Sequence, residues 1–107
     1  MSAALPDATR VVVIGGGIIG ASIAYHLVAR GESDVLLLER DRFTSGTTWH
    51  AAGLVAQLRA TEELTRMSRY SLEVYQRLEG ETGKAKGFQQ PGAISLATTP
   101  ERFTELA

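Results

Sequence analysis

Three glycines and one glutamate stand at spacings that suit a dinucleotide-binding site. Gly15, Gly17 and Gly20 form a G-x-G-x-x-G pattern. The pattern directly follows the apolar run 11–14, and Glu39 stands where the next apolar run ends. In such a site the first glycine permits a tight turn, the second lets a pyrophosphate approach the backbone, and the third lets a helix pack closely. Because a carboxylate at the next strand end can accept hydrogen bonds from ribose hydroxyls, the four residues together predict a dinucleotide site.

The elements that must hold these residues form a strand–helix–strand unit. Residues 11–14 are a β-branched run, typical of a strand buried on both faces of a parallel sheet. Apolar residues recur at helical spacing from Ile18 to about Arg30, and Gly31 stands where a C-cap glycine is expected. Residues 35–38 are a second strand of the buried type. This order predicts a parallel βαβ unit, so the predicted fold class is α/β and Rossmann-like.

The first residues of the predicted helix should contact the phosphates of the dinucleotide. The backbone N–H groups of Ile18 and Ile19 lie at its N-terminus, where the helix dipole is positive. Glu39 would repel a 2′-phosphate, which disfavours NADP, although the neighbouring Arg40 leaves that alternative open. The glycine pattern does not choose between NAD and FAD.

A longer amphipathic helix is expected further along the chain. Thr61 is the predicted N-cap, and Gly80 and Gly83 are the predicted end signals. The inner stripe of this helix is expected to comprise Leu64, Met67, Ser71, Val74, Tyr75 and Leu78.

The sequence of residues 93–107 predicts a short strand followed by the start of a helix. Residues 93–97 alternate in polarity, which favours a short strand, and Thr99 and Pro100 suit the N-cap and first position of a helix. We therefore expect an incomplete fold. Residues 1–82 would form the N-terminal part of a cofactor-binding domain, and residues 83–107 would begin a substrate domain or a connecting region.

The composition excludes several functional classes. The 107 residues carry a net charge of −1, which gives no electrostatic reason to expect nucleic acid as a partner. There are no cysteines and only two histidines, so we predict neither disulfides nor a metal site. Residues 11–29 lack charged side chains and are long enough to suggest a membrane span, but the glycine run 15–17 argues against one. No membrane span and no signal peptide are predicted.

The segment after Glu39 carries a more specific signal. Residues 45–53 have the sequence SGTTWHAAG. Together with residues 11–44, this segment resembles the N-terminus of the glycine/D-amino-acid oxidase group of flavoproteins, and most closely the sarcosine and dimethylglycine dehydrogenases and oxidases. The resemblance implies the N-terminal part of an FAD-binding domain, from an enzyme several times longer. It also implies FAD as the cofactor, held covalently by His50 through the 8α-methyl group of the flavin. The cofactor-binding residues expected in this segment are Ser45, Gly46, Thr47, Thr48, Trp49, His50 and Gly53.

The residue types in this segment suit such a role. Its small residues would let the backbone lie against a flat ring system, and Thr47 and Thr48 offer hydroxyls for hydrogen bonds. Trp49 would shield the flavin from water. Imidazole is mostly neutral near pH 7 and can act as a nucleophile. By residue chemistry alone His50 would be an ordinary loop histidine and Trp49 a core residue. The match of the whole segment favours the cofactor roles.

The resemblance also implies a reaction. It points to an FAD-dependent oxidoreductase acting on the C–N bond of a small amine such as sarcosine or dimethylglycine, with hydride transfer to the flavin. Oxygen or a carrier protein would accept the electrons, folate could take the released carbon, and the location would be the cytoplasm, or the mitochondrial matrix in a eukaryote. No catalytic residue is predicted within residues 1–107, because substrate-facing side chains should come from later strands. The alternatives are an NAD-binding dehydrogenase domain and a truncated chain that is inactive alone.

Overall fold

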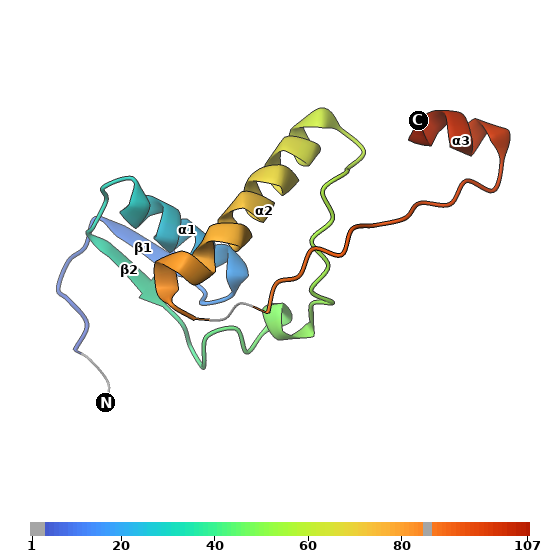
Figure 1. The fold of residues 1–107 in the computed structure, drawn as a ribbon. Coiled ribbons are helices and arrows are strands. Elements are labelled where there is room, and N and C mark those ends of the chain that lie inside the picture. Colours follow the sequence, from blue (N-terminus) through green and yellow to red (C-terminus); the bar gives the residue numbers. More distant parts are fainter. Residues whose placement is uncertain (1–3, 85–86) are drawn as a thin grey trace. The chain divides into compact units, whose positions relative to one another are not determined.

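The computed structural model describes residues 4–84 and 87–107. They form two compact units that divide between Leu54 and Val55. In chain order the elements are β1 (Val11–Ile14), α1 (Ile18–Ala29), β2 (Val35–Leu38), the 3₁₀ helix η1 (Thr47–His50), α2 (Glu62–Thr82) and α3 (Pro100–Leu106) (Figure 1).

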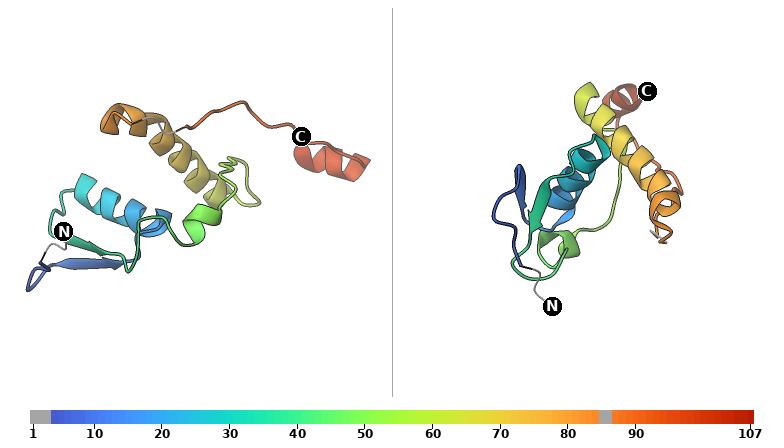
Figure 2. Two further views of the ribbon diagram at one scale, coloured as in Figure 1. Left: turned by 90° about the horizontal axis from the view of Figure 1, so that it is seen from below. Right: turned by 90° about the vertical axis from the view of Figure 1, so that its left-hand side faces the viewer.

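The first unit is built on the predicted βαβ motif. β1 and β2 pair in parallel, from Val11 opposite Val35 to Ile14 opposite Leu38. α1 connects them and packs against one face of the strand pair (Figure 2). The prediction of an α/β, Rossmann-like unit is thereby confirmed.

The burial of β1 differs from the prediction. Val13 is 8% exposed, whereas Val12 is 49% and Ile14 is 84% exposed. Successive side chains of a strand point to opposite faces, and within this unit α1 covers only one face of the two-stranded sheet. The expectation of burial on both faces is therefore wrong for this chain.

The C-terminus of α1 ends as its sequence predicts. Gly31 has φ +93°, a conformation that costs glycine little. Its N–H donates to the Val28 carbonyl, and the Glu32 N–H donates to the Leu27 carbonyl. These bonds satisfy carbonyl groups that the helix itself leaves free.

The second unit contains α2 and α3, which begin at the predicted caps. The Thr61 hydroxyl accepts from the Leu64 N–H, and the Thr99 hydroxyl accepts from the Arg102 N–H. α2 ends at Gly83, which has φ +66°. Gly80, the other predicted end signal, lies inside the helix.

Two predictions for the second unit are wrong. Residues 93–97 form no strand, and Ile94 and Leu96 are 93% and 83% exposed. An alternating segment needs a neighbouring strand, and none of the described residues pairs with it. On α2, the buried residue is Leu72, outside the predicted stripe, while Met67 is 66% exposed. The position of Tyr75 agrees better with the prediction, since its ring stacks on Phe88 with centroids 5.6 Å apart.

Two further properties concern the described residues as a set. No helix within residues 4–84 and 87–107 combines the length and the apolar character that a membrane crossing requires. In the same residues, no three histidine or carboxylate side chains gather closely enough to hold a metal ion.

Candidate functional site

The glycine turn lies between the end of β1 and the start of α1. Gly15 has φ +109°, a backbone conformation that favours glycine, and its N–H donates to the Leu38 carbonyl over 2.8 Å. Gly20 is buried in the first turn of α1. A Cβ atom on Gly20 would lie 1.8 Å from the Gly15 carbonyl oxygen. The first and third glycines thus permit the tight turn and the close approach of the helix that the pattern predicts.

The second glycine lies where α1 meets the segment that contains His50. Gly17 is the N-cap residue of α1, and the N–H of Ile18 donates to the Thr48 hydroxyl over 2.9 Å. A Cβ atom on Gly17 would lie 2.9 Å from that same hydroxyl oxygen. Glycine at this position therefore leaves room for Thr48, and the structure brings two parts of the predicted site together.

The N-terminus of α1 suits an anion. Its first turn, which belongs to the described residues, contains no acidic side chain, and Gly17 offers no side-chain cap. Free backbone N–H groups and the helix dipole attract phosphate at such an end. Ile18 and Ile19 are 52% and 75% exposed, so these two residues lie at the surface of the unit.

The carboxylate of Glu39 has backbone partners that the sequence did not reveal. One oxygen accepts from the Gly16 N–H over 2.7 Å, and the other accepts from the Asp41 N–H over 3.0 Å. The bond from Gly16, followed by the bond from Asp41, lowers the pKa of Glu39 below its usual 4.5, with a smaller contribution from Arg40. Each carboxylate oxygen has a further lone pair, so the group could still accept from ribose hydroxyls.

The segment 45–53 contains η1 and an extended stretch. His50 Nδ1 lies 3.1 Å from the Gly46 carbonyl oxygen. Because a carbonyl oxygen only accepts, Nδ1 is the donor in this hydrogen bond, and Nε2 is the ring nitrogen that makes no bond to Gly46. Trp49 is 78% exposed, and Gly53 follows η1 with φ +72°. Ser45 donates its backbone N–H to the Arg42 carbonyl, while Thr47 and Arg40 are exposed.

Three neighbouring residues belong to this site although the sequence analysis did not select them. The Gly16 carbonyl accepts from the Thr44 N–H over 3.0 Å, and Thr44 has φ +66°. The ring of Phe43 occupies the space beside the Gly16 α-carbon. The available signal was the third consecutive glycine, because G-x-G-x-x-G does not require glycine at position 16.

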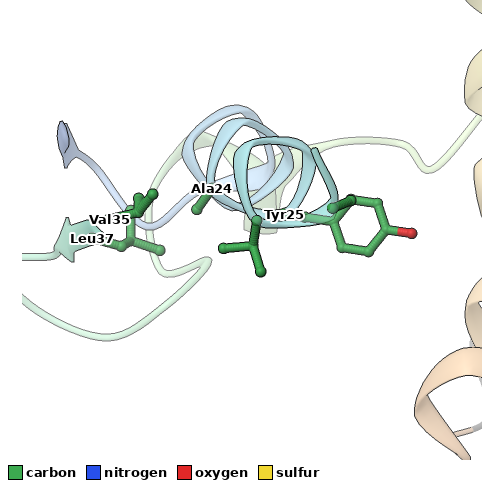
Figure 3. A pocket seen from close by; sticks show the side chains of 6 residues that line it. Ala24, Tyr25, Val35 and Leu37 are labelled. Carbon is green, nitrogen blue, oxygen red and sulfur yellow. The ribbon is translucent and has the colours of Figure 1, made fainter. Parts of the chain in front are cut away.

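An apolar groove lies elsewhere in the first unit. It runs beside the second half of α1 and β2, away from the glycine turn (Figure 3). Its lining residues are Ala24, Tyr25, Val28, Ala29, Val35 and Leu37. With no charged side chain in its lining, this groove does not resemble a phosphate site.

Comparisons with known proteins place the amino-acid sequence of this chain in a family. The family described as "FAD dependent oxidoreductase" (DAO) matches residues 10–107. The chain is 54% identical over 102 residues to 4-methylaminobutanoate oxidase (formaldehyde-forming) of Paenarthrobacter nicotinovorans, covering 95% of this chain and 12% of that protein.

Two mammalian proteins show similar relationships. Mitochondrial dimethylglycine dehydrogenase of Rattus norvegicus is 50% identical over 99 residues, which are 92% of this chain and 12% of that protein. Mitochondrial sarcosine dehydrogenase of Homo sapiens is 45% identical over 102 residues, which are 94% of this chain and 11% of that protein. The chain thus spans about one eighth of the length of these relatives. The resemblance inferred from residues 11–53 is confirmed.

Proposed function

The chain belongs to the FAD dependent oxidoreductase family, and we propose that it forms the part of an amine-oxidising enzyme that binds FAD and holds it covalently. The observation that carries this proposal is the hydrogen bond between Ile18 and Thr48. It joins the phosphate-binding end of α1 to η1, whose last residue is His50. The alternative of an NAD-binding domain would leave segment 45–53 without a role.

The glycine turn would hold the adenosine and pyrophosphate part of the cofactor. Backbone N–H groups at the start of α1, including that of Ile19, would face the phosphates, and Ile18, whose own N–H donates to Thr48, would lie beside them. Glu39 would accept from the ribose hydroxyls with the lone pairs that Gly16 and Asp41 do not use. Its negative charge would repel a 2′-phosphate, a group that NADP carries and FAD lacks.

Segment 45–53 would hold the flavin end. Bound FAD would take a hydride from the carbon next to the substrate nitrogen. With Nδ1 donating to the Gly46 carbonyl, we assign Nε2 as the atom that would bond to the flavin 8α carbon. This bond would replace one 8α hydrogen and release one imidazole proton, and the two electrons would leave through the flavin to the electron acceptor of the enzyme. The exposed Trp49 and the backbone around Gly53 would lie against the ring system.

The names of the relatives indicate the substrate class. They act on 4-methylaminobutanoate, dimethylglycine and sarcosine, which are all N-methylated amines. We infer a small N-methylated amine as the substrate of the whole protein. Oxygen or a carrier protein as electron acceptor, folate as carbon acceptor, and the division into residues 1–82 and 83–107 stay predictions. Two of these relatives are mitochondrial, which supports the matrix as the location if the source is eukaryotic.

Covalent attachment of FAD can be tested by the visible absorbance of the denatured protein. The full-length protein is denatured in acid and separated from small molecules, and its absorbance is recorded. We expect yellow colour to stay with the wild-type polypeptide and to be lost in His50→Ala. His26→Gln is the matched control, because His26 lies within α1 and contacts Ser22 of the same helix. Release of the colour from wild type would contradict covalent attachment, and a colourless native protein would contradict FAD binding.

A further inference from the structure

Gly16 has contacts that its place in the sequence pattern does not require. It is a buried residue, and both of its backbone polar groups bond to the chain that follows β2. Its N–H donates to Glu39 over 2.7 Å, and its carbonyl accepts from the Thr44 N–H over 3.0 Å. One glycine therefore connects the turn after β1 to the loop that leads to η1.

A side chain at position 16 would collide with this loop. A Cβ atom on Gly16 would lie 2.4 Å from Phe43 Cδ1 and 3.0 Å from Glu39 Cβ. The Phe43 ring thus occupies the space that any other residue at position 16 would need. Since the ring is 63% exposed, it covers Gly16 from the solvent side and is not part of a larger core.

The backbone of Thr44 is strained, and its hydrogen bond to Gly16 holds it in that conformation. Thr44 has φ +66°, which is rare for a β-branched residue and costs free energy. Such a conformation persists only where neighbouring contacts determine it. Here the neighbouring contacts are the bond to Gly16 and the packing of the adjacent Phe43 ring.

A second attachment lies a few residues later. The Thr48 hydroxyl accepts from the Ile18 N–H. The loop is therefore fixed to the glycine turn both before and within η1, and His50 stands at the end of η1. Both attachments are hydrogen bonds between protein atoms, so they do not require bound flavin.

We propose that Gly16 is a positioning residue that, with Phe43 and Thr44, docks the loop after β2 on the glycine turn and so places His50 for the flavin. The docking follows from the contacts above, and its effect on the flavin rests on the proposed function. Glycine at position 16 leaves room for the observed Phe43 ring, and a side chain there would have to displace the ring.

The first test needs no flavin. Arg40 and Arg42 are exposed trypsin sites within the loop. Full-length protein freed of flavin, or produced without it, is treated briefly with trypsin. We expect Gly16→Ala to be cut at these sites about tenfold faster than wild type, because overpacking shifts the loop toward open states. Gly80→Ala is the matched control, since a Cβ atom at that helical position meets nothing within 4 Å.

A double variant separates the ring contact from a general folding defect. Phe43→Ala removes the ring that a side chain at position 16 would strike. We expect Gly16→Ala/Phe43→Ala to return to the cleavage rate of Phe43→Ala alone. If Gly16→Ala does not fold, restored folding in the double variant supports the proposal, and a double variant that also fails to fold overturns it.

The second measurement is the rate at which added FAD becomes covalently attached. We expect attachment to slow about tenfold in Gly16→Ala and to recover in the double variant. Cleavage of Gly16→Ala at the rate of Gly80→Ala would overturn the docking, and faster cleavage with unchanged attachment would overturn the positioning role. A wild-type protein that takes up no flavin would contradict the proposed function instead, and the trypsin comparison would still decide whether Gly16 docks the loop.

Discussion

Gly20→Ala would place a methyl group in the narrowest contact of the glycine turn. The added carbon would lie 1.8 Å from the Gly15 carbonyl oxygen and 3.4 Å from Val13 Cγ1. The first contact is with backbone, so rotation of a side chain cannot relieve it. Gly15 itself is fixed by φ +109° and by its N–H bond to Leu38.

The size of the effect follows from the displacement that is needed. Real Cβ atoms essentially never approach closer than 3.0 Å, so α1 and the turn must separate by about 1.2 Å. Overpacking of a tight site costs typically about 1–3 kcal/mol, and a backbone clash of this size belongs at the upper end. The separation would also move the N–H of Ile18 away from its partner Thr48. We therefore expect a loss of about 3 kcal/mol in the free energy of unfolding, together with slower covalent attachment of added FAD.

The assay compares Gly20→Ala with Gly80→Ala in the full-length protein. We expect the thermal transition that includes this domain to fall by about 5 °C or more in Gly20→Ala. Gly80 lies inside α2 with open space around it, so Gly80→Ala should be neutral or stabilising by up to about 1 kcal/mol. Equal melting temperatures and equal rates of FAD attachment in the two variants would refute the close packing of α1 on the turn.

Three further predictions concern side chains that accept hydrogen bonds from backbone N–H groups. Thr48→Val removes the acceptor for the Ile18 N–H and should slow the covalent attachment of added FAD about threefold to tenfold, whereas Thr48→Ser should attach FAD at the wild-type rate. The pKa of Glu39 is lower in the folded protein than in the unfolded chain, where it is near 4.5. The ionised carboxylate therefore stabilises the fold fully above pH 4.5, and this contribution is lost as the pH falls through the folded-state pKa. The melting temperatures of wild type and Glu39→Gln should therefore draw closer as the pH is lowered from about 6 to below 4.5, and a constant difference would contradict this role. Thr61→Ala removes the N-cap bond to Leu64 and should cost about 1 kcal/mol, while Thr61→Ser should cost less, as measured by the unfolding of α2 in hydrogen exchange.

The parts of the fold that depend on local chemistry were predictable from the sequence. The βαβ order follows from two apolar runs, a glycine turn and a helical pattern. The caps at Thr61 and Thr99 and the C-terminal glycines Gly31 and Gly83 follow from the needs of free backbone groups at helix ends. Each of these features is determined within a few residues.

The parts that depend on distant partners were not predictable. Residues 93–97 alternate like a strand, but the described residues provide no neighbouring strand for them. On α2, Met67 and Leu72 are both apolar, and periodicity alone did not identify Leu72 as the buried one.

In the candidate site, too, local features were predictable from the sequence and contacts between distant segments were not. The roles of Gly15 and Gly20 in the turn were predictable, because the G-x-G-x-x-G pattern is a local signature. The contacts of Gly16 with Glu39 and Thr44 link segments that are far apart in the sequence. Three consecutive glycines indicated a crowded turn but could not name the ring of Phe43 as the neighbour.

The central claim is that His50 carries FAD, and peptide mapping of the full-length protein tests it most directly. Trypsin should release residues 43–59, which contain His50 as their only histidine. We predict that this peptide has gained the mass of one FAD less two hydrogens, because the new C–N bond replaces one hydrogen on each partner, and that fragmentation places the gain on His50. An unmodified peptide from a flavin-containing protein, or a flavin attached to a different peptide, would contradict the claim.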